Sequence, residues 1–368
     1  MKKGKGRAAR YLSALLVVAL TAALWALPIQ SAADASSSLD ETLGRHERAA
    51  ISLDFSRLFG SGSSMAGRIL VPGGQAVGVA IRTQGVLVVG LSDGAGVKAG
   101  LRAGDVLISV NGRPLDSADV LTETVNAAAG QPLSIVLERD GKQHTHLATP
   151  QYDESSQSYR LGVWVRDSTA GVGTMTFYDP QTQRYGALGH AITDSDTGLV
   201  LPVREGNVMD AEIVSVRRGE RGMPGELKGS FLREQVSLGS VKRNSTSGIF
   251  GQLDGDIRNP LYPQGLPVGD KKDVHTGKAT ILSTVGGKEM VEYTVEITQV
   301  TRASEQKSLV LHVTDERFLE KTGGIVQGMS GSPIIQDGKI IGAVTHVFVN
   351  DPTRGYGIFI ENMLGAAS

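Results

Sequence analysis

The 368-residue chain contains no cysteine, few aromatic residues and almost no net charge. The absence of cysteine excludes disulfide bonds, a thiol nucleophile and metal sites built from thiolates. Aromatic residues make up 5% of the chain while glycine occurs 47 times, a mixture that favours turn-rich β structure over long helical bundles. With 37 basic and 38 acidic residues the formal net charge is -1, so no global field attracts nucleic acid.

A charge-free apolar run follows a basic N-terminus. The first ten residues carry five positive charges, and the 16 residues of Leu12–Leu27 carry none. A basic flank, an apolar run and then a polar Ser/Ala-rich segment are typical of an export signal. The run is slightly short for a bilayer span, so cleavage near Ala33–Ala35 and retention as an anchor both stay open. We expect a signal peptide or membrane anchor over residues 1–30 and a flexible tether over residues 31–66.

Residues 67–150 contain the order of elements found in PDZ domains. Two apolar strand-like runs precede a short helical turn, the strand "AGDVLISVNG", the helix "DSADVLTETVNAAAG" and a hairpin around Asp140-Gly141. This order, with "AGLRAGDVLISVNG" inside it, resembles a PDZ domain, which binds an extended peptide at a sheet edge beside a helix. The resemblance implies that the loop Gln75–Val79 receives a peptide terminus and that Val120, Leu121 and Val125 wall the groove. The loop residues are Gln75, Ala76, Val77, Gly78 and Val79. The alternative is a structural PDZ domain in which all of these residues only pack.

From residue 151 to residue 368 the chain consists of many short β runs separated by Gly, Pro, Asn and Asp. Examples are "RLGVWVRD", "AEIVSVRRG" and "MVEYTVEITQV". This pattern favours a β-sandwich or a pair of β-barrels over a parallel α/β sheet.

The stretch "GMSGSP" at 328–333 surrounds a serine with small residues. Glycines let a substrate carbonyl approach closely and let successive backbone N–H groups point at one spot. The stretch resembles the G-x-S-G-G-P nucleophile loop of chymotrypsin-like peptidases, in which Ser330 attacks and the N–H groups of Gly328 and Ser330 form the oxyanion hole. Ser332 is the rival nucleophile, and a plain turn between two strands is the structural alternative.

A serine nucleophile needs a base, and His190 in "YGALGHAITD" is the first candidate among seven histidines. It precedes Ser330, as in the chymotrypsin order, and His346 on the strand after the serine hairpin is the second candidate. Asp315, 15 residues before Ser330, is the candidate carboxylate. Spacing leaves two interpretations of Asp315 open, because it could also be the N-cap of a short helix over residues 316–322.

Taken together, these features resemble the stage IV sporulation protein B peptidase family of endospore-forming bacteria. The resemblance rests on the export signal, the PDZ-like region, "ALGHAITD" and the stretch from "TDERFLEKTGG" through "GMSGSPIIQDGKIIGAVTHVFVNDPTRGYGIFIENML", in that order. It implies the catalytic residues His190, Asp315 and Ser330. It also implies a mainly β fold, in which a PDZ domain is followed by a chymotrypsin-like double β-barrel.

Members of this family are serine endopeptidases delivered from the forespore into the space between the two sporulation membranes. The resemblance implies that the chain cleaves itself and then a regulator of an intramembrane metalloprotease, which leads to late sigma-factor activation in the mother cell. The expected partners are therefore a protein substrate, the chain itself and, through the N-terminus, a membrane.

Two other functions stay open from the sequence. One is a general envelope protease that pairs a chymotrypsin-like domain with PDZ modules, and the other is a non-catalytic PDZ adaptor. The chain has no H-E-x-x-H motif and no glycine loop that ends in Gly-Lys-Ser/Thr. We therefore expect neither a metal nor another cofactor, and no nucleic-acid partner.

Overall fold

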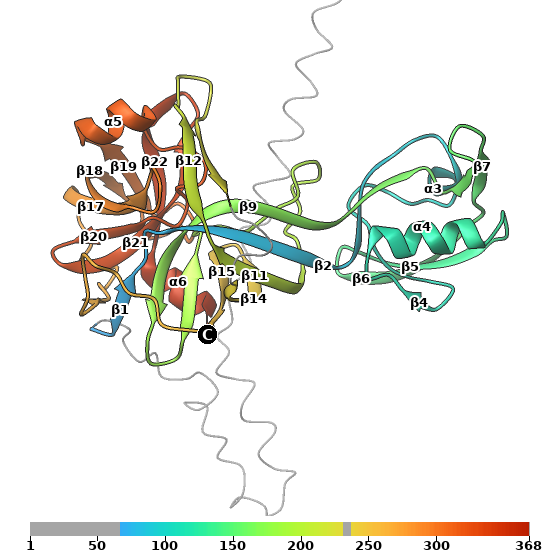
Figure 1. Cartoon of the computed structure of the whole chain (residues 1–368), viewed down its shortest axis with the longest axis horizontal. Helices are drawn as coiled ribbons and strands as arrows, with labels where there is room; N and C mark the ends of the chain where they lie inside the picture. The colour runs from blue at the N-terminus through green and yellow to red at the C-terminus, as the bar shows by residue number, and fades with distance from the viewer. Residues whose placement is uncertain (1–66, 231–236, 368) are drawn as a thin grey trace, which may run out of the picture. The chain divides into compact units, whose positions relative to one another are not determined.

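The computed structural model describes residues 67–230 and 237–367, which contain two closed β-barrels and a PDZ-like unit (Figure 1). In the first barrel, antiparallel strands form a ring whose last member pairs again with the first. The ring order is β2 (Ala76–Leu91), β9 (Val163–Asp179), β10 (Arg184–Ala187), β15 (Gly248–Leu253), β14 (Ser237–Ser245) and β11 (Val203–Asp210). Closing the ring hides its strand edges, and its interior is filled by apolar side chains such as Val77, Ile81 and Val208.

The PDZ-like unit is inserted between the first two strands of this barrel. Residues 76–82 of β2 pair with residues 168–174 of β9 inside the barrel, and residues 87–91 pair with residues 163–166 inside the PDZ-like unit. The chain between them forms α3 (Ala95–Lys98), β3 (Val106–Val110), β4 (Arg113–Pro114), α4 (Ala118–Ala127), β5 (Leu133–Arg139), β6 (Lys142–Ala148), β7 (Gln151–Asp153) and β8 (Ser158–Arg160). A separate apolar core, which includes Leu107, Leu121 and Ile135, holds this unit together.

The insertion corrects the domain boundaries that the sequence predicted. We expected a PDZ domain over residues 67–150 and the peptidase from residue 151. In the structure, β1 (Ile69–Pro72) pairs with β9, and residues 76–82 lie between β9 and β11, so the barrel begins before the PDZ-like unit. Sequence patterns could not separate the two parts, because one continuous 16-residue strand runs through both.

The second barrel is closed by the order β17 (Gly277–Thr284), β18 (Met290–Val300), β19 (Leu309–Val313), β22 (Asp351–Phe359), β21 (Lys339–Phe348) and β20 (Pro333–Gln336). Its apolar core includes Ile281, Leu311 and Ile334. Two helices belong to this half of the chain, α5 (Glu316–Thr322) and α6 (Ile360–Ala367). The smaller pairs are β12 (Glu212–Arg217) with β13 (Glu226–Ser230), and β16 (Leu266–Pro267) with β1. The expectation of a mainly β fold with a PDZ-like unit and two barrels is confirmed.

The predicted export signal and tether, residues 1–66, lie outside the described residues. Among residues 67–230 and 237–367, no helix combines the length and the apolar composition needed to cross a bilayer.

Candidate active site

The nucleophile loop lies between α5 and β20 of the second barrel. Met329 is fully buried and anchors the loop, while the next residue, Ser330, is partly exposed. Gly331 has a φ of 99°, and a Cβ atom there would lie 2.0 Å from the carbonyl oxygen of Thr174, so only glycine fits. Thr174 of β9 also holds the loop directly, since its N–H donates to the Ser330 carbonyl at 3.0 Å and its hydroxyl donates to the Gly328 carbonyl at 2.8 Å.

The serine hydroxyl and its neighbouring N–H groups are arranged for acyl chemistry. Ser330 Oγ donates to the carbonyl oxygen of Thr345 on β21, at 2.6 Å. Within the described chain, the N–H groups of Gly328 and Ser330 donate to no backbone carbonyl, as an oxyanion hole requires. The rival nucleophile Ser332 is fully buried, and its hydroxyl has no hydrogen-bond partner among the described residues. Its burial leaves Ser330 as the serine that a substrate can reach.

His190 follows β10 of the first barrel, where Leu188 and Gly189 both adopt a left-handed φ of 69°. The imidazole Nδ1 lies 2.8 Å from the carbonyl oxygen of Ala191. Because a carbonyl can only accept, Nδ1 carries the proton in the neutral ring, and Nε2 is left with the lone pair of a general base. His190 is therefore held in the tautomer that deprotonation of a serine needs.

Asn244 at the end of β14 fixes the loop that follows His190. No sequence pattern predicted this role. Its side-chain oxygen accepts the N–H of Ile192 at 2.8 Å, and its Nδ2 donates to the carbonyls of Ile192 at 2.7 Å and Leu201 at 3.0 Å. Further along the loop, Asp194 accepts from the backbone of Asp196 at 3.1 Å and Thr197 at 2.8 Å.

One pocket of about 670 Å³ brings the two predicted catalytic residues together. His190 and Ser330 both line it, and Thr345 and His346 of β21 line it beside them. The first barrel therefore supplies the candidate base, His190, and the second barrel supplies the candidate nucleophile, Ser330.

Two family models match parts of the chain. The family model described as SpoIVB peptidase S55 matches residues 157–364, more than half of the chain. The chain belongs to this family. A PDZ domain model matches residues 88–139. The same chain therefore carries both a SpoIVB peptidase S55 region and a PDZ domain.

Individual relatives cover less of the chain. A probable periplasmic serine protease do/HhoA-like of Haemophilus influenzae is 38% identical over 68 residues, which are 18% of this chain and 15% of that protein. The zinc metalloprotease RasP of Geobacillus kaustophilus is 36% identical over 59 residues, 16% of this chain and 14% of that protein. The chain therefore spans less than a quarter of the length of either relative. The active form of the Rv3671c protease of Mycobacterium tuberculosis aligns with a TM-score of 0.30 at 15% identity, covering 54% of this chain and 72% of that chain.

In this S55 peptidase a second imidazole lies against the base. The ring centroids of His190 and His346 are 4.8 Å apart. Burial lowers the pKa of His190, and the bond to Ala191 offsets this only in part. Burial, with the nearby charges of His190 and Lys307, lowers the pKa of His346 to about 4. Both rings are therefore neutral at neutral pH, which is the form that a base must have.

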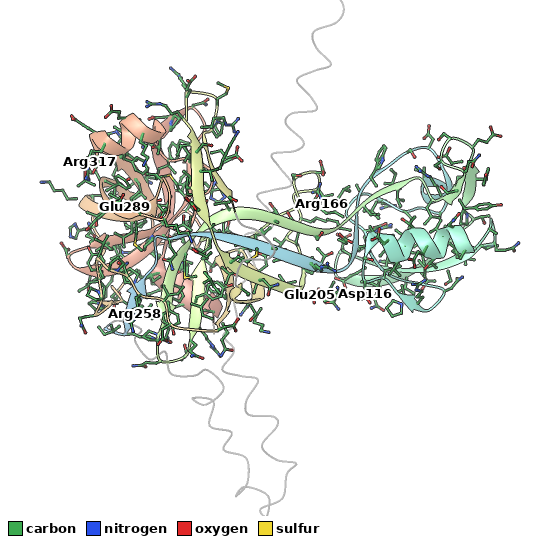
Figure 2. All side chains as sticks on the ribbon, viewed as in Figure 1. Asp116, Arg166, Glu205, Arg258, Glu289 and Arg317 are labelled. Carbon is green, nitrogen blue, oxygen red and sulfur yellow. The ribbon has the colours of Figure 1, made fainter. Side chains whose placement is uncertain are left out.

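Asp315 does not line the pocket of this S55 peptidase. Its carboxylate caps α5 by accepting the N–H of Phe318 at 3.3 Å, and it also accepts the N–H of Thr294 at 3.3 Å. Arg317, labelled on α5 in Figure 2, donates to Asp315 at 2.8 Å and lowers the pKa of that carboxyl against the effect of burial. The structure thus brings His190 and Ser330 together but leaves Asp315 in its helix-capping role.

The predicted PDZ residues of the S55 peptidase also separate into two groups. Leu121 and Val125 of α4 are buried in the PDZ core, and Val120 packs against it. Residues 77–79 instead form part of the first barrel, paired on both sides with β9 and β11. Ala76 pairs with Thr174 of β9, and the carbonyl of Gln75 accepts the N–H of Met175. The prediction that Gln75, Ala76, Val77, Gly78 and Val79 receive a peptide terminus is therefore wrong. Backbone groups that already pair with two neighbouring strands cannot pair with a ligand.

No set of three or more His, Asp or Glu side chains in residues 67–230 and 237–367 is placed to hold a metal ion.

Proposed function

We propose that this chain is the sporulation endopeptidase that the resemblance implies. It would act outside the cytoplasm, between the two membranes around a forming spore, after export through its N-terminal segment. Its substrates would be its own tether and a protein regulator of a membrane-embedded metalloprotease, whose release leads to late sigma-factor activation. The observation that carries the proposal is the pocket shared by His190 and Ser330 in a chain of the SpoIVB S55 family.

The reaction uses the groups that face this pocket. The hydroxyl of Ser330 leaves the carbonyl of Thr345 by rotation about its Cα–Cβ bond and gives its proton to His190 Nε2. Oγ then bonds to the substrate carbonyl carbon, and the N–H groups of Gly328 and Ser330 stabilise the oxyanion. His190 returns the proton to the leaving amine as the C–N bond breaks. Water, deprotonated by the same ring, hydrolyses the acyl-enzyme and restores the hydroxyl.

The tether is the proposed site of self-cleavage. Residues 31–66 are rich in small and polar side chains, with runs such as "SAADASSS" and "GSGSSMAG". Segments of this composition fit easily in an extended form into a peptidase cleft. Cleavage there would release the barrels and the PDZ domain from the N-terminal apolar run.

A matched pair of serine variants tests the proposal in the full chain. Ser330→Ala should abolish labelling by a fluorophosphonate and should leave the N-terminus of the exported chain uncut within residues 31–66. Ser332→Ala removes a buried hydroxyl two residues away and should keep at least about a tenth of the wild-type labelling rate, since only packing is disturbed. N-terminal sequencing and mass spectrometry of cleavage products, with the regulator protein present, give the second readout.

Three outcomes would count against the proposal. Full labelling of a folded Ser330→Ala chain would remove Ser330 from the mechanism. The wild-type chain could instead label normally while its tether and the regulator both stay uncut. That result would indicate a serine peptidase with another role, such as general envelope proteolysis. A folded wild-type chain that does not label at all would favour the non-catalytic PDZ adaptor.

A further inference from the structure

The pocket shared by His190 and Ser330 presents an uncharged wall to a substrate. Aliphatic side chains line it, among them Ile325, Val326 and Val347, together with uncharged polar ones. No Asp, Glu, Lys or Arg of the described chain lines the pocket. A charged substrate side chain would lose much of its hydration there without gaining a partner of opposite charge. The pocket therefore favours uncharged substrate side chains.

The position of the reacting carbonyl determines where the substrate side chain next to the cut must lie. The carbonyl carbon lies beside Ser330 Oγ while its oxygen points to the N–H groups of Gly328 and Ser330. The side chain of the residue that supplies this carbonyl then meets the wall segments that adjoin Ser330. These are residues 325–328, which precede the serine, and residues 345–347 of β21, whose Thr345 carbonyl accepts the serine hydroxyl.

The side chain of Ile325 closes the base of the pocket at this point. It lines the pocket but is only 2% exposed, and its Cδ1 atom would lie 2.6 Å from a Cβ atom built on Gly355 of β22. Gly355 pairs directly with Val347, so the isoleucine packs on the backbone beneath the wall. A large substrate side chain would have to occupy the volume that Ile325 already fills.

The segment that carries Ile325 is held on both sides. The N–H of Ile325 donates to the Pro352 carbonyl at 2.8 Å. On the side of the β12–β13 hairpin, the N–H of Gln327 donates to the Gly225 carbonyl at 2.9 Å, and the Gln327 carbonyl accepts the N–H of Leu227 at 2.8 Å. A side chain in a close-packed, anchored segment has little empty space to move into. Ile325 therefore cannot withdraw easily to admit a larger group.

We propose that Ile325 restricts cleavage to positions that follow a small, uncharged residue of the size of alanine, serine or valine. The inference rests on the proposed function and deepens it, because it names the class of residue on the amino side of the cut. Within residues 31–66 it favours cuts after alanine or serine over cuts after Phe55, Phe59 or an arginine.

Phosphonate probes that differ in one side chain test this restriction on the full chain. Peptidyl diphenyl phosphonates with alanine, phenylalanine or lysine next to the phosphorus are compared with a fluorophosphonate, which has no such side chain. The alanine probe should label Ser330 at least about tenfold faster than either of the other two peptidyl probes, as expected when one pocket contact excludes a side chain.

Substitutions at two isoleucines link the restriction to Ile325. Ile325→Ala opens the space over Gly355 and should raise the rate of the phenylalanine probe, relative to the alanine probe, at least about tenfold. If that variant does not fold, Ile325→Val removes only Cδ1 and should shift the ratio in the same direction by at least about threefold. The same two substitutions at Ile341, a core residue of the same barrel that does not line the pocket, should leave the ratio unchanged.

Mass spectrometry of the self-cleaved chain gives a second readout, with a cut expected after an alanine or a serine in residues 31–66. Equal rates with the alanine and phenylalanine probes, in a chain that the fluorophosphonate labels, would overturn the inference and leave the proposed function standing. So would a folded Ile325→Ala chain with the wild-type ratio, or a cut after a larger residue such as Phe55. A chain that no probe labels would instead contradict the proposed function.

Discussion

In the proposed mechanism the chemistry depends on His190, whose tautomer is set by one backbone carbonyl. In the serine peptidase triad a carboxylate does this and also stabilises the imidazolium that forms during the reaction. Here the carbonyl of Ala191 takes the Nδ1 proton, and the nearby aromatic partner is the neutral ring of His346. A carbonyl fixes the orientation but offers less charge stabilisation than a carboxylate, so we expect a peptidase of modest intrinsic rate.

The pKa of His190 leads to a prediction about pH. Burial lowers this pKa below the ordinary value of 6.5, so the ring stays unprotonated, and able to act as a base, into mildly acidic solution. The rate of fluorophosphonate labelling, measured from pH 4.5 to pH 8, should fall on the acid side with a midpoint below 6.5. His346→Gln should keep that low midpoint, because burial is the main cause of the shift in His190. A midpoint above 6.5 in the wild-type chain would show that a carboxylate reaches the ring in solution.

Among the elements, the loop after His190 is held by three hydrogen bonds from one side chain, Asn244. Asn244 satisfies one N–H and two carbonyl groups of that loop, and loss of a partner for buried polar groups costs about 1–3 kcal/mol. A loop that loses these bonds would place the imidazole less accurately, and small misplacements slow catalysis steeply.

Substitution of Asn244 should therefore reduce activity more than it reduces stability. We expect Asn244→Ala to lower the labelling rate about 10- to 100-fold while the protein stays folded by circular dichroism. Asn244→Asp keeps the acceptor for the N–H of Ile192 but loses the two N–H donors to the Ile192 and Leu201 carbonyls. Its labelling rate should therefore lie between that of the wild type and that of Asn244→Ala. Asn126→Ala removes one bond, to the N–H of Tyr159 in the PDZ domain, and serves as the control with a near wild-type rate. A wild-type rate in Asn244→Ala would mean that other contacts hold the loop.

Elements set by local sequence were predicted well, and elements set by long-range pairing were not. The helix expected over residues 316–322 is present with those bounds, capped by Asp315 and ended by Gly323 with a φ of 73°, because capping signals are local. The small residues around Ser330 likewise predicted the tight loop at 328–333. The pairing of residues 163–166 with residues 87–91 spans more than 70 positions, and alternation alone cannot say which strand a segment joins. The role of Asn244 could not be predicted from the sequence, because its partners are backbone groups, which every residue has.

For the whole molecule, the main consequence of the insertion is that the PDZ domain is not a removable N-terminal piece. Residues 76–82 are needed to close the first barrel, so truncation of residues 67–150 would open the ring between β9 and β11. An open barrel exposes two strand edges and its apolar interior. A truncated chain that fails to fold would therefore say nothing about the role of the PDZ domain.

Excision at the insertion points should keep the barrel and its chemistry. Arg82 and Ser168 are cross-strand partners, so replacing residues 85–165 by Asn-Gly would join the two strands through a two-residue hairpin turn. This design keeps Arg166 and its bonds to the loop after His190. We expect the excised chain to fold and to be labelled at Ser330, whereas the chain that lacks residues 67–150 should be insoluble or unlabelled. If the excised chain unfolds while the truncated chain stays active, the assignment of β2 to the first barrel is wrong.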